Sequence, residues 1–293
     1  MLIKPDCIPC ILRMSVTAMR ALHMDESRSR SLYRRIAQYP GLRGETWNVV
    51  SPSIIEGIMD IIKKSAEASD PFSLLKWKQN KRALEVEQQI ASIIQEEADP
   101  LHGAVRLAIL GNMIDLMVQD GPSDFMHWIR SRLQVPISDA AYERFRERLS
   151  RARLVAYMGD NSGEIVFDKQ LIKTIKAHYS PEIVFVVRST ATMNDVTLRE
   201  AEDTGMKELV PVIENGIQGP FPGTSLKRCS QEVRDLLSRA DLIISKGGGN
   251  FDSLSEEETE FTEKTTFMLL SKCQPYCDVF GTNLHEPVLA HLP

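Results

Sequence analysis

Residues 154–164 read LVAYMGDNSGE: a short apolar run, a polar turn and the start of a helix-like segment. Similar apolar runs follow at 183–187, 209–213, 242–245 and 267–270. Helix-like stretches at 165–179, 196–204, 230–240 and 254–263 lie among them. Strands that alternate with helices predict βαβ units, because parallel strands need a crossover connection. We therefore predict an α/β domain with a mostly parallel sheet over residues 151–293.

The first half of the chain has a different pattern. Apolar residues recur at helical spacing over 11–30, 51–68 and 79–98, and runs of β-branched residues between turns are nearly absent. A further helix is expected over 136–152, where it would bridge the two halves. The sequence thus predicts a mostly α-helical domain over residues 1–150.

Composition excludes several classes of protein. The 293 residues are 43% apolar and 26% charged, which is typical of a globular protein and not of a disordered one. A net charge of -5 provides no basic excess for nucleic acid, and no apolar stretch is long enough to span a membrane. Five cysteines, an odd number, predict free thiols in a reducing cytoplasm. The oligomeric state is left open.

Three polar segments follow expected strands. They are residues 159–164 (GDNSGE), 188–195 (RSTATMND) and 246–252 (KGGGNFD). Ligands of open α/β sheets bind at the carboxyl ends of the strands, so we expect these segments to converge at one edge.

The first two segments carry oxygen ligands. Asp160 and Asn161 follow the first strand, and Asp195 with its neighbour Asn194 follows the second. An all-oxygen set of this kind favours Mg²⁺ or Mn²⁺ over zinc. The alternative is an ordinary βα turn in which Asp160 or Ser162 caps a helix.

The third segment carries the opposite charge. Three glycines after Lys246 allow successive N–H groups to bind an anion, although a flexible turn is the simpler explanation. The order of residues matches neither a Walker loop nor a dinucleotide fingerprint. A metal loop and an anion loop at one sheet edge together suggest a phosphorylated substrate.

The first half has its own candidates. Cys7 and Cys10 form a CxxC pair that is compatible with metal binding, with redox chemistry or with plain buried thiols. Cys273 and Cys277 are available as further metal ligands in the sequence. Residues 111–115 (GNMID) place Asn and Asp in an apolar stretch, either facing a cleft or on the solvent side of a helix. No two of the six histidines have ligand spacing.

These segments resemble the metal-dependent damage-control phosphatases, long catalogued as domain of unknown function 89, whose prokaryotic branch carries an N-terminal CxxC. The family's DNxGE motif is matched by Asp160, Asn161, Gly163 and Glu164. Other matches, in the family's order from residue 4 to about 285, are GNxxD at Gly111, Asn112 and Asp115; DPF…LK at Asp70, Pro71, Phe72, Leu75 and Lys76; and KGxGNF with a following acid at Lys246, Gly247, Gly249, Asn250, Phe251 and Asp252.

The chain departs from the family in one loop. The pattern R/K-G-x-P-x-x-N-D keeps its ends here, at Arg188, Asn194 and Asp195. Ser189 and Ala191 replace the Gly and the Pro, which changes the backbone freedom of the loop.

The resemblance implies a helical N-terminal part packed on a Rossmann-like αβα part. It also implies hydrolysis of phosphate monoesters, such as damaged sugar phosphates, with one ion of the Mg²⁺ or Mn²⁺ class held by Asp160, Asn161 and Asp195. Lys246 is expected to neutralise the transferring phosphoryl group. Orienting roles are expected for Glu164 and Asn112. The residues expected to contact substrate are Arg188, Gly247, Gly248, Gly249, Asn250 and Asp115.

Two alternatives belong to other functional classes. One is an S-adenosylmethionine-dependent carboxyl methyltransferase, an activity also described for eukaryotic relatives, which would require an acid at the end of the second strand where this chain has Arg188. The other is a non-catalytic metal- or metabolite-binding protein that uses the same pocket.

Overall fold

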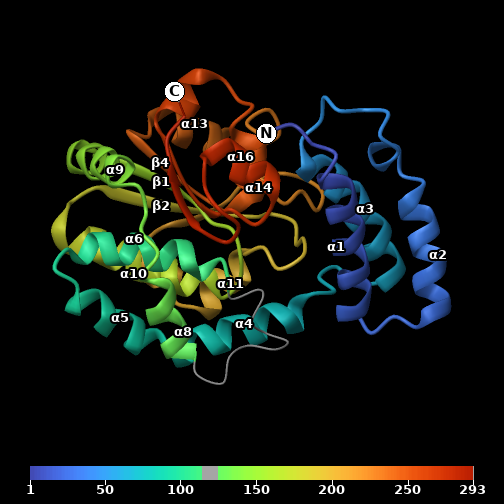
Figure 1. Cartoon of the computed structure of the whole chain (residues 1–293), viewed down its shortest axis with the longest axis horizontal. Coiled ribbons are helices and arrows are strands. Elements are labelled where there is room, and N and C mark those ends of the chain that lie inside the picture. Colours follow the sequence, from blue (N-terminus) through green and yellow to red (C-terminus); the bar gives the residue numbers. More distant parts are fainter. Residues whose placement is uncertain (114–124, 293) are drawn as a thin grey trace.

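The computed structural model describes residues 1–113 and 125–292 and contains a six-stranded sheet with the order β3-β2-β1-β4-β5-β6 (Figure 1). The strands are β1 (Leu154–Met158), β2 (Glu182–Val187), β3 (Val212–Glu214), β4 (Leu242–Lys246), β5 (Thr265–Leu270) and β6 (Pro287–Ala290). The first five pair in parallel, and β6 runs antiparallel to β5. The predicted α/β class with a mostly parallel sheet is confirmed. Strand order reverses between β1 and β4, the place where such sheets bind ligands.

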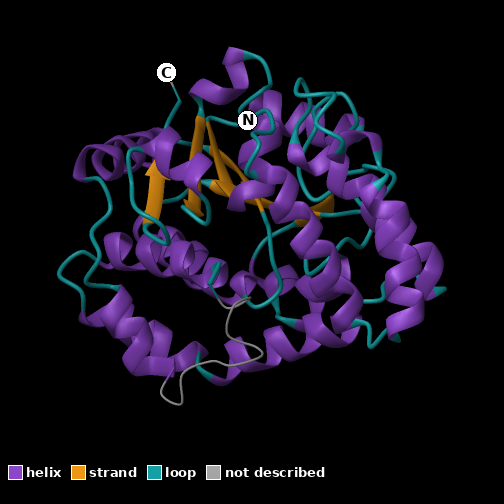
Figure 2. Cartoon of the chain, turned by 45° about the vertical axis from the view of Figure 1, so that its right-hand side comes forward, coloured by secondary structure: helices purple, strands orange, loops and turns teal. Residues whose placement is uncertain are grey.

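Alternate residues of the strands cover the two faces of the sheet. On β1, Val155 and Tyr157 pack with the helices α6 (Pro100–Gly111) and α10 (Glu164–His178). Ala156 and Met158 pack on the other side with α13 (Gln231–Arg239), α14 (Gly247–Leu254) and α16 (Gln274–Phe280). Figures 1 and 2 show the sheet between these two helical layers. Because both faces are buried, the strands are almost continuously apolar.

The remaining helices follow the expected periodicity with two differences. They are α1 (Cys7–Ala21), α2 (Glu26–Ala37), a 3-10 turn at Pro40–Leu42, α3 (Ser51–Ala66), α4 (Ser73–Glu85), α5 (Glu87–Glu96), α8 (Phe125–Arg132), α9 (Asp139–Arg151), α11 (Leu198–Asp203), α12 (Met206–Leu209) and α15 (Thr259–Glu263). The helix predicted over 11–30 is two helices, because Asp25 caps a new one with a bond from the Arg28 N–H. The helix predicted over 79–98 is broken at Val86.

The later elements also differ from expectation. The strand predicted at 209–213 begins only at Val212, since residues 206–209 form α12. The predicted helix at 254–263 is replaced by α14 and α15, with α14 beginning at the glycines of the KGGGN segment. Strand β6 was not predicted: it has four residues and begins with a proline at the sheet edge.

Apolar residues from both sides of residue 150 pack together. Buried residues from 83 to 289 form one cluster between α4–α10 and the sheet. A separate core lies under α1, α2 and α3. We call residues 1–72, which contain these three helices, the N-terminal lobe. The change from helices alone to alternating strands and helices does fall near residue 154, while division into two domains at 150 stays a prediction. Among the described residues, no helix is long and apolar enough to cross a membrane.

The packing of α10 on α6 generates a stability prediction. Phe167 of α10 is 1% exposed, and its ring lies against Gly111 of α6. We expect Phe167→Ala to lower the free energy of unfolding by about 3–5 kcal/mol, because it leaves a cavity in the shared core. Urea denaturation measures this, with Val279→Ala on exposed α16 surface as control. Equal midpoints for the two variants would contradict the described packing.

Candidate functional site

The segments after β1 and β2 are joined by backbone hydrogen bonds. The Val196 N–H donates to the Asp160 carbonyl at 2.9 Å, and the Ser162 N–H donates to the Asn194 carbonyl at 2.8 Å. Between these two bonds, Asn161 pairs with Asp195 as an isolated antiparallel bridge. The three residues expected to hold a metal are therefore on directly paired stretches of chain.

Arg188 connects the acids of both segments. Its guanidinium is 2% exposed, donates to Asp195 Oδ2 at 2.7 Å and lies 3.6 Å from Asp160 Oδ1. It also donates to Asn250 Oδ1 and to the Gly223 carbonyl, both at 2.9 Å. Its Nη2 has no hydrogen-bond partner among the described residues, and the expected contact of Arg188 with substrate stays a prediction.

Two amides link Asp160 to Glu164. Asn112, at the end of α6, donates to Asp160 Oδ2 at 3.1 Å and to Glu164 Oε2 at 2.7 Å. The Asn161 amide bridges the same two oxygens at 2.6 and 3.1 Å. The structure thus brings Asn112 and Glu164 into the site, as expected. Asp115 lies outside the described residues.

Lys246 is oriented differently from the expectation. Its side chain is fully buried, and the ammonium donates to Glu164 and Asp168, both at 2.6 Å, and to the Ala108 carbonyl at 2.8 Å. Burial alone would lower the pKa of Lys246, but the two carboxylates raise it above its ordinary value. The ammonium is charged and held in the interior behind Glu164, with its three donors used by the protein.

The glycines after Lys246 form the first turn of α14 instead of a loop. Gly247 has φ +75°, and a Cβ there would lie 1.8 Å from Asp160 Oδ2. Asp160 can therefore approach the beginning of α14 only because Gly247 has no side chain. Asn250 completes the turn: its amide donates to the carbonyls of Gly159 and Lys246. Gly248 and Gly249 continue this turn of the helix.

In the loop that departs from the family pattern, Ser189 is hydrogen-bonded to residues that follow β3. Ser189 Oγ accepts from the Gly216 N–H at 2.6 Å and donates to Asn215. The positive φ of this loop is at Met193, φ +41°, and neither Ser189 nor Ala191 has one. The replacement of Gly by Ser therefore places no side chain in the left-handed region.

Negative charge exceeds positive charge in the buried site. Asp160, Asp195, Glu164 and Asp168 are each 7% exposed or less, and within the described residues their ion-pair partners are Arg188 and Lys246. The formal excess is two negative charges. Burial, Glu164 and Asp195 raise the pKa of Asp160 well above its ordinary value, and burial raises that of Asp195 against the opposing effect of Arg188.

This excess fits a divalent cation. Asp160 and Asp195 provide two hard oxygen ligands, and a half-turn of the Asn161 amide exchanges its nitrogen for its oxygen. Across residues 1–113 and 125–292, no three His, Cys, Asp or Glu side chains form a ready-made metal cage. The remaining ligands would be water, which Mg²⁺ usually retains.

Sequence reasoning missed Asp168, Asn80 and Lys272. Asp168 lies one helical turn after Glu164, a spacing that could have revealed it. Asn80 of α4 accepts from the Gly163 N–H at 2.6 Å, a contact between residues 83 positions apart that no local signal predicts. Lys272, exposed after β5, is near enough to lower the pKa of Asp160 against its burial.

The CxxC pair lies at the beginning of α1. Cys7 is half-buried and its sulfur accepts from the Lys4 N–H at 3.3 Å, whereas Cys10 is exposed. Burial raises the pKa of Cys273 to about 11, with additions from Cys7 and Cys10. All five cysteines are free. A metal or redox role for the pair stays a prediction.

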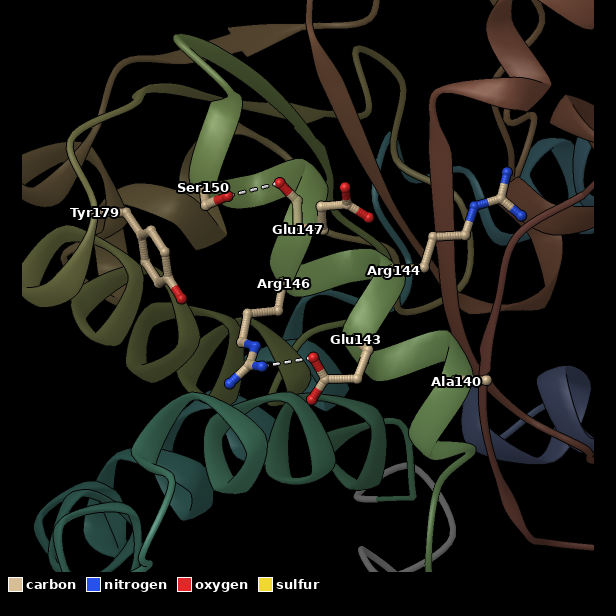
Figure 3. Close-up of a pocket in the computed structure, with 7 residues that line it drawn as sticks. All are labelled: Ala140, Glu143, Arg144, Arg146, Glu147, Ser150 and Tyr179. Carbon is tan, nitrogen blue, oxygen red and sulfur yellow. Dashed lines mark hydrogen bonds and ion pairs between the residues drawn. The ribbon is translucent and has the colours of Figure 1, made fainter.

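A surface hollow of about 730 Å³ lies along α9, away from these segments (Figure 3). It is lined by Glu143, Arg146, Tyr179 and neighbouring residues, and the Arg146 guanidinium contacts Glu143 at 2.6 Å. None of the expected site residues lines it.

The chain is similar in sequence and in structure to known proteins of one family. The chain is 30% identical over 293 residues to an uncharacterized protein of Methanocaldococcus jannaschii, MJ0202, covering 98% of this chain and 94% of that protein. It is 32% identical over 205 residues to the damage-control phosphatase PH1575 of Pyrococcus horikoshii, covering 70% and 68%. The crystal structure of PH1575, a DUF89 family protein, matches with a TM-score of 0.85 at 26% identity over 99% of both chains. Residues 3–288 match the family described as the damage-control phosphatase ARMT1-like domain. The chain therefore belongs to the ARMT1-like damage-control phosphatase family.

Proposed function

We propose that the protein is a metal-dependent phosphatase that hydrolyses phosphate monoesters of small metabolites. Family membership and the names of two relatives, PH1575 and a damage-control phosphatase of Archaeoglobus fulgidus that is 29% identical over 222 residues, support the activity. The observation that carries the proposal is the buried excess of negative charge where β1 and β2 end. A cluster that needs a divalent cation at a ligand-binding edge suits phosphoryl chemistry.

Asp160, Asn161 and Asp195 are the residues that would hold Mg²⁺ or Mn²⁺. A bound cation of this kind neutralises charge on a phosphoryl group and lowers the pKa of water. Arg188 fixes the orientation of Asp160 and Asp195 by contacting both carboxylates.

The surrounding residues have distinct tasks. Asn112 and the hydrogen bonds from Lys246 and Asn161 hold Glu164 beside Asp160, which makes Glu164 the orienting carboxylate. The N-terminus of α14, with Gly247 against Asp160, presents the positive end of a helix dipole to a phosphate. Lys272, the exposed ammonium near Asp160, adds positive charge for an anionic substrate.

The alternative functions receive less support. A methyltransferase would need an acid after β2 to bind ribose hydroxyls. That position holds Arg188, whose guanidinium is bound to Asp195. A non-catalytic binding protein would use the same cation site and would show metal binding without turnover.

The free thiols of the protein also suit a location in a reducing cytoplasm.

Substitution of Asp160 should abolish turnover. We expect Asp160→Asn to reduce hydrolysis of 4-nitrophenyl phosphate in Mn²⁺ by about 100-fold or more, because it removes a ligand charge at the reacting centre. Asp278→Asn, on the exposed surface of α16, is the matched control. Full activity of Asp160→Asn would refute the assignment.

Removal of metal should stop the reaction without unfolding the protein. Dialysis against a chelator is expected to abolish hydrolysis, and Mn²⁺ or Mg²⁺ should restore it. The far-ultraviolet circular dichroism spectrum should stay unchanged, since the shared core contains none of the proposed ligands. Hydrolysis that persists in the chelated protein would contradict metal dependence.

The raised pKa of Asp160 predicts a pH dependence of stability. A carboxyl whose pKa is higher in the folded state stabilises the fold below its unfolded pKa, about 4, and loses that contribution as the pH rises. In metal-free protein, Asp160→Asn should therefore melt at a higher temperature than the wild type near neutral pH. This gain should shrink as the pH falls toward 4. A variant that melts at a lower temperature than the wild type at neutral pH would show that ionised Asp160 does not destabilise the fold.

A further inference from the structure

Helix α4 buries a polar face. Lys76 is fully buried and Asn80 is 3% exposed, although lysine and asparagine are seldom found in protein interiors. The two residues are four positions apart, so they lie on the same face of the helix. Helix α4 contacts α10 and α11, which follow the two segments expected to hold the metal (Figure 1).

Asn80 holds the first segment. Its Oδ1 accepts a hydrogen bond from the Gly163 N–H at 2.6 Å, and Gly163 has φ +78°. Gly163 lies between Asn161 and Glu164, so this bond sets the path of the chain that carries the site side chains. Asn80 Nδ2 is buried with no hydrogen-bond partner in the described part of the chain.

Lys76 holds the second segment. Its ammonium lies 2.9 Å from Glu200 Oε2 and 2.6 Å from Asp70 Oδ2. The same Glu200 oxygen accepts from the N–H of Thr197 at 2.9 Å and from its hydroxyl at 2.6 Å. Burial alone would raise the pKa of Glu200, but Lys76 and Thr197 keep it below its ordinary value. The ionised Glu200 carboxylate thus holds Thr197, two residues after Asp195, by two hydrogen bonds.

Helix α4 therefore contacts the first half of the proposed cation site directly, at Gly163, and the second half through Glu200, which is hydrogen-bonded to Thr197. We infer that Lys76 and Asn80 are positioning residues, through which α4 fixes the place and the path of the paired Asp160 and Asp195 segments. The inference deepens the proposed function and rests on it, because it concerns the same site. It also gives a task to the DPF…LK motif, in which Asp70 neutralises Lys76 and accepts from the Phe72 N–H at 3.1 Å.

Titration with Mn²⁺ tests this role. We expect Asn80→Ala and Lys76→Met to raise the Mn²⁺ dissociation constant about 10- to 100-fold, the usual cost of losing a residue that orients metal ligands. The loss of turnover should be largely recovered at high Mn²⁺, and Lys76→Arg should retain more affinity than Lys76→Met. Lys78→Met, on the exposed face of α4, should bind as the wild type does.

Hydrogen exchange of the metal-free protein provides a second readout. Amides of residues 159–164 and 188–197 should exchange faster in Asn80→Ala than in the wild type or in Lys78→Met. Because Lys76→Met leaves Asp70 and Glu200 without their cation and can unfold the chain, Asn80→Ala decides the question.

The two readouts separate the inference from the proposed function. A folded Asn80→Ala with wild-type exchange in both segments overturns the positioning role, whether or not the wild type is a phosphatase. If the wild type neither binds Mn²⁺ nor hydrolyses phosphate esters, the proposed function fails. Faster exchange in Asn80→Ala would still support the positioning of the two segments by α4.

Discussion

Repulsion between buried carboxylates is the constraint on which this structure depends. Asp160 and Asp195 lie on neighbouring segments, and repulsion between their two carboxylates favours separation of these segments. Backbone hydrogen bonds between the two segments, together with the Arg188 guanidinium, hold the segments together. Behind them, Lys246 compensates Glu164 and Asp168. The protein thus keeps an electrostatically unfavourable group of acids, an arrangement typical of functional sites.

The helical first half contributes directly to this arrangement. Asn112 comes from the end of α6, and the buried polar face of α4 reaches both segments. From the N-terminal lobe, the Lys63 ammonium donates to the Ala191 carbonyl at 2.8 Å. Met193, held at φ +41°, packs against the core of that lobe. Helices that precede the sheet in the chain therefore fix the loops that follow its strands.

The main features of the fold and the position of the site could be predicted from local patterns. Short apolar runs between helical stretches identify the strands, and the rule for carboxyl ends places Asp160 and Asp195 together. The orientation of Lys246 could not be predicted, because its partner Ala108 is 138 residues away. Likewise, the helix at Gly247–Leu254 could not be predicted, because glycine has a low helix propensity. This helix results from tertiary packing, such as the contact of Asp160 with Gly247.

The separate core of the N-terminal lobe has a consequence for how the molecule comes apart. Its buried apolar residues form a cluster of their own, on which Met193 also packs. Polar links such as Lys63 to Ala191 and Arg228 to Glu56 add to the contacts between the lobe and the rest of the molecule. Such an element behaves as its own cooperative unit, whose opening costs less free energy than global unfolding. Partial denaturation of the lobe would then break the hydrogen bond from Lys63 to the Ala191 carbonyl while the sheet remains intact. Enzymatic activity would therefore be lost before most of the secondary structure.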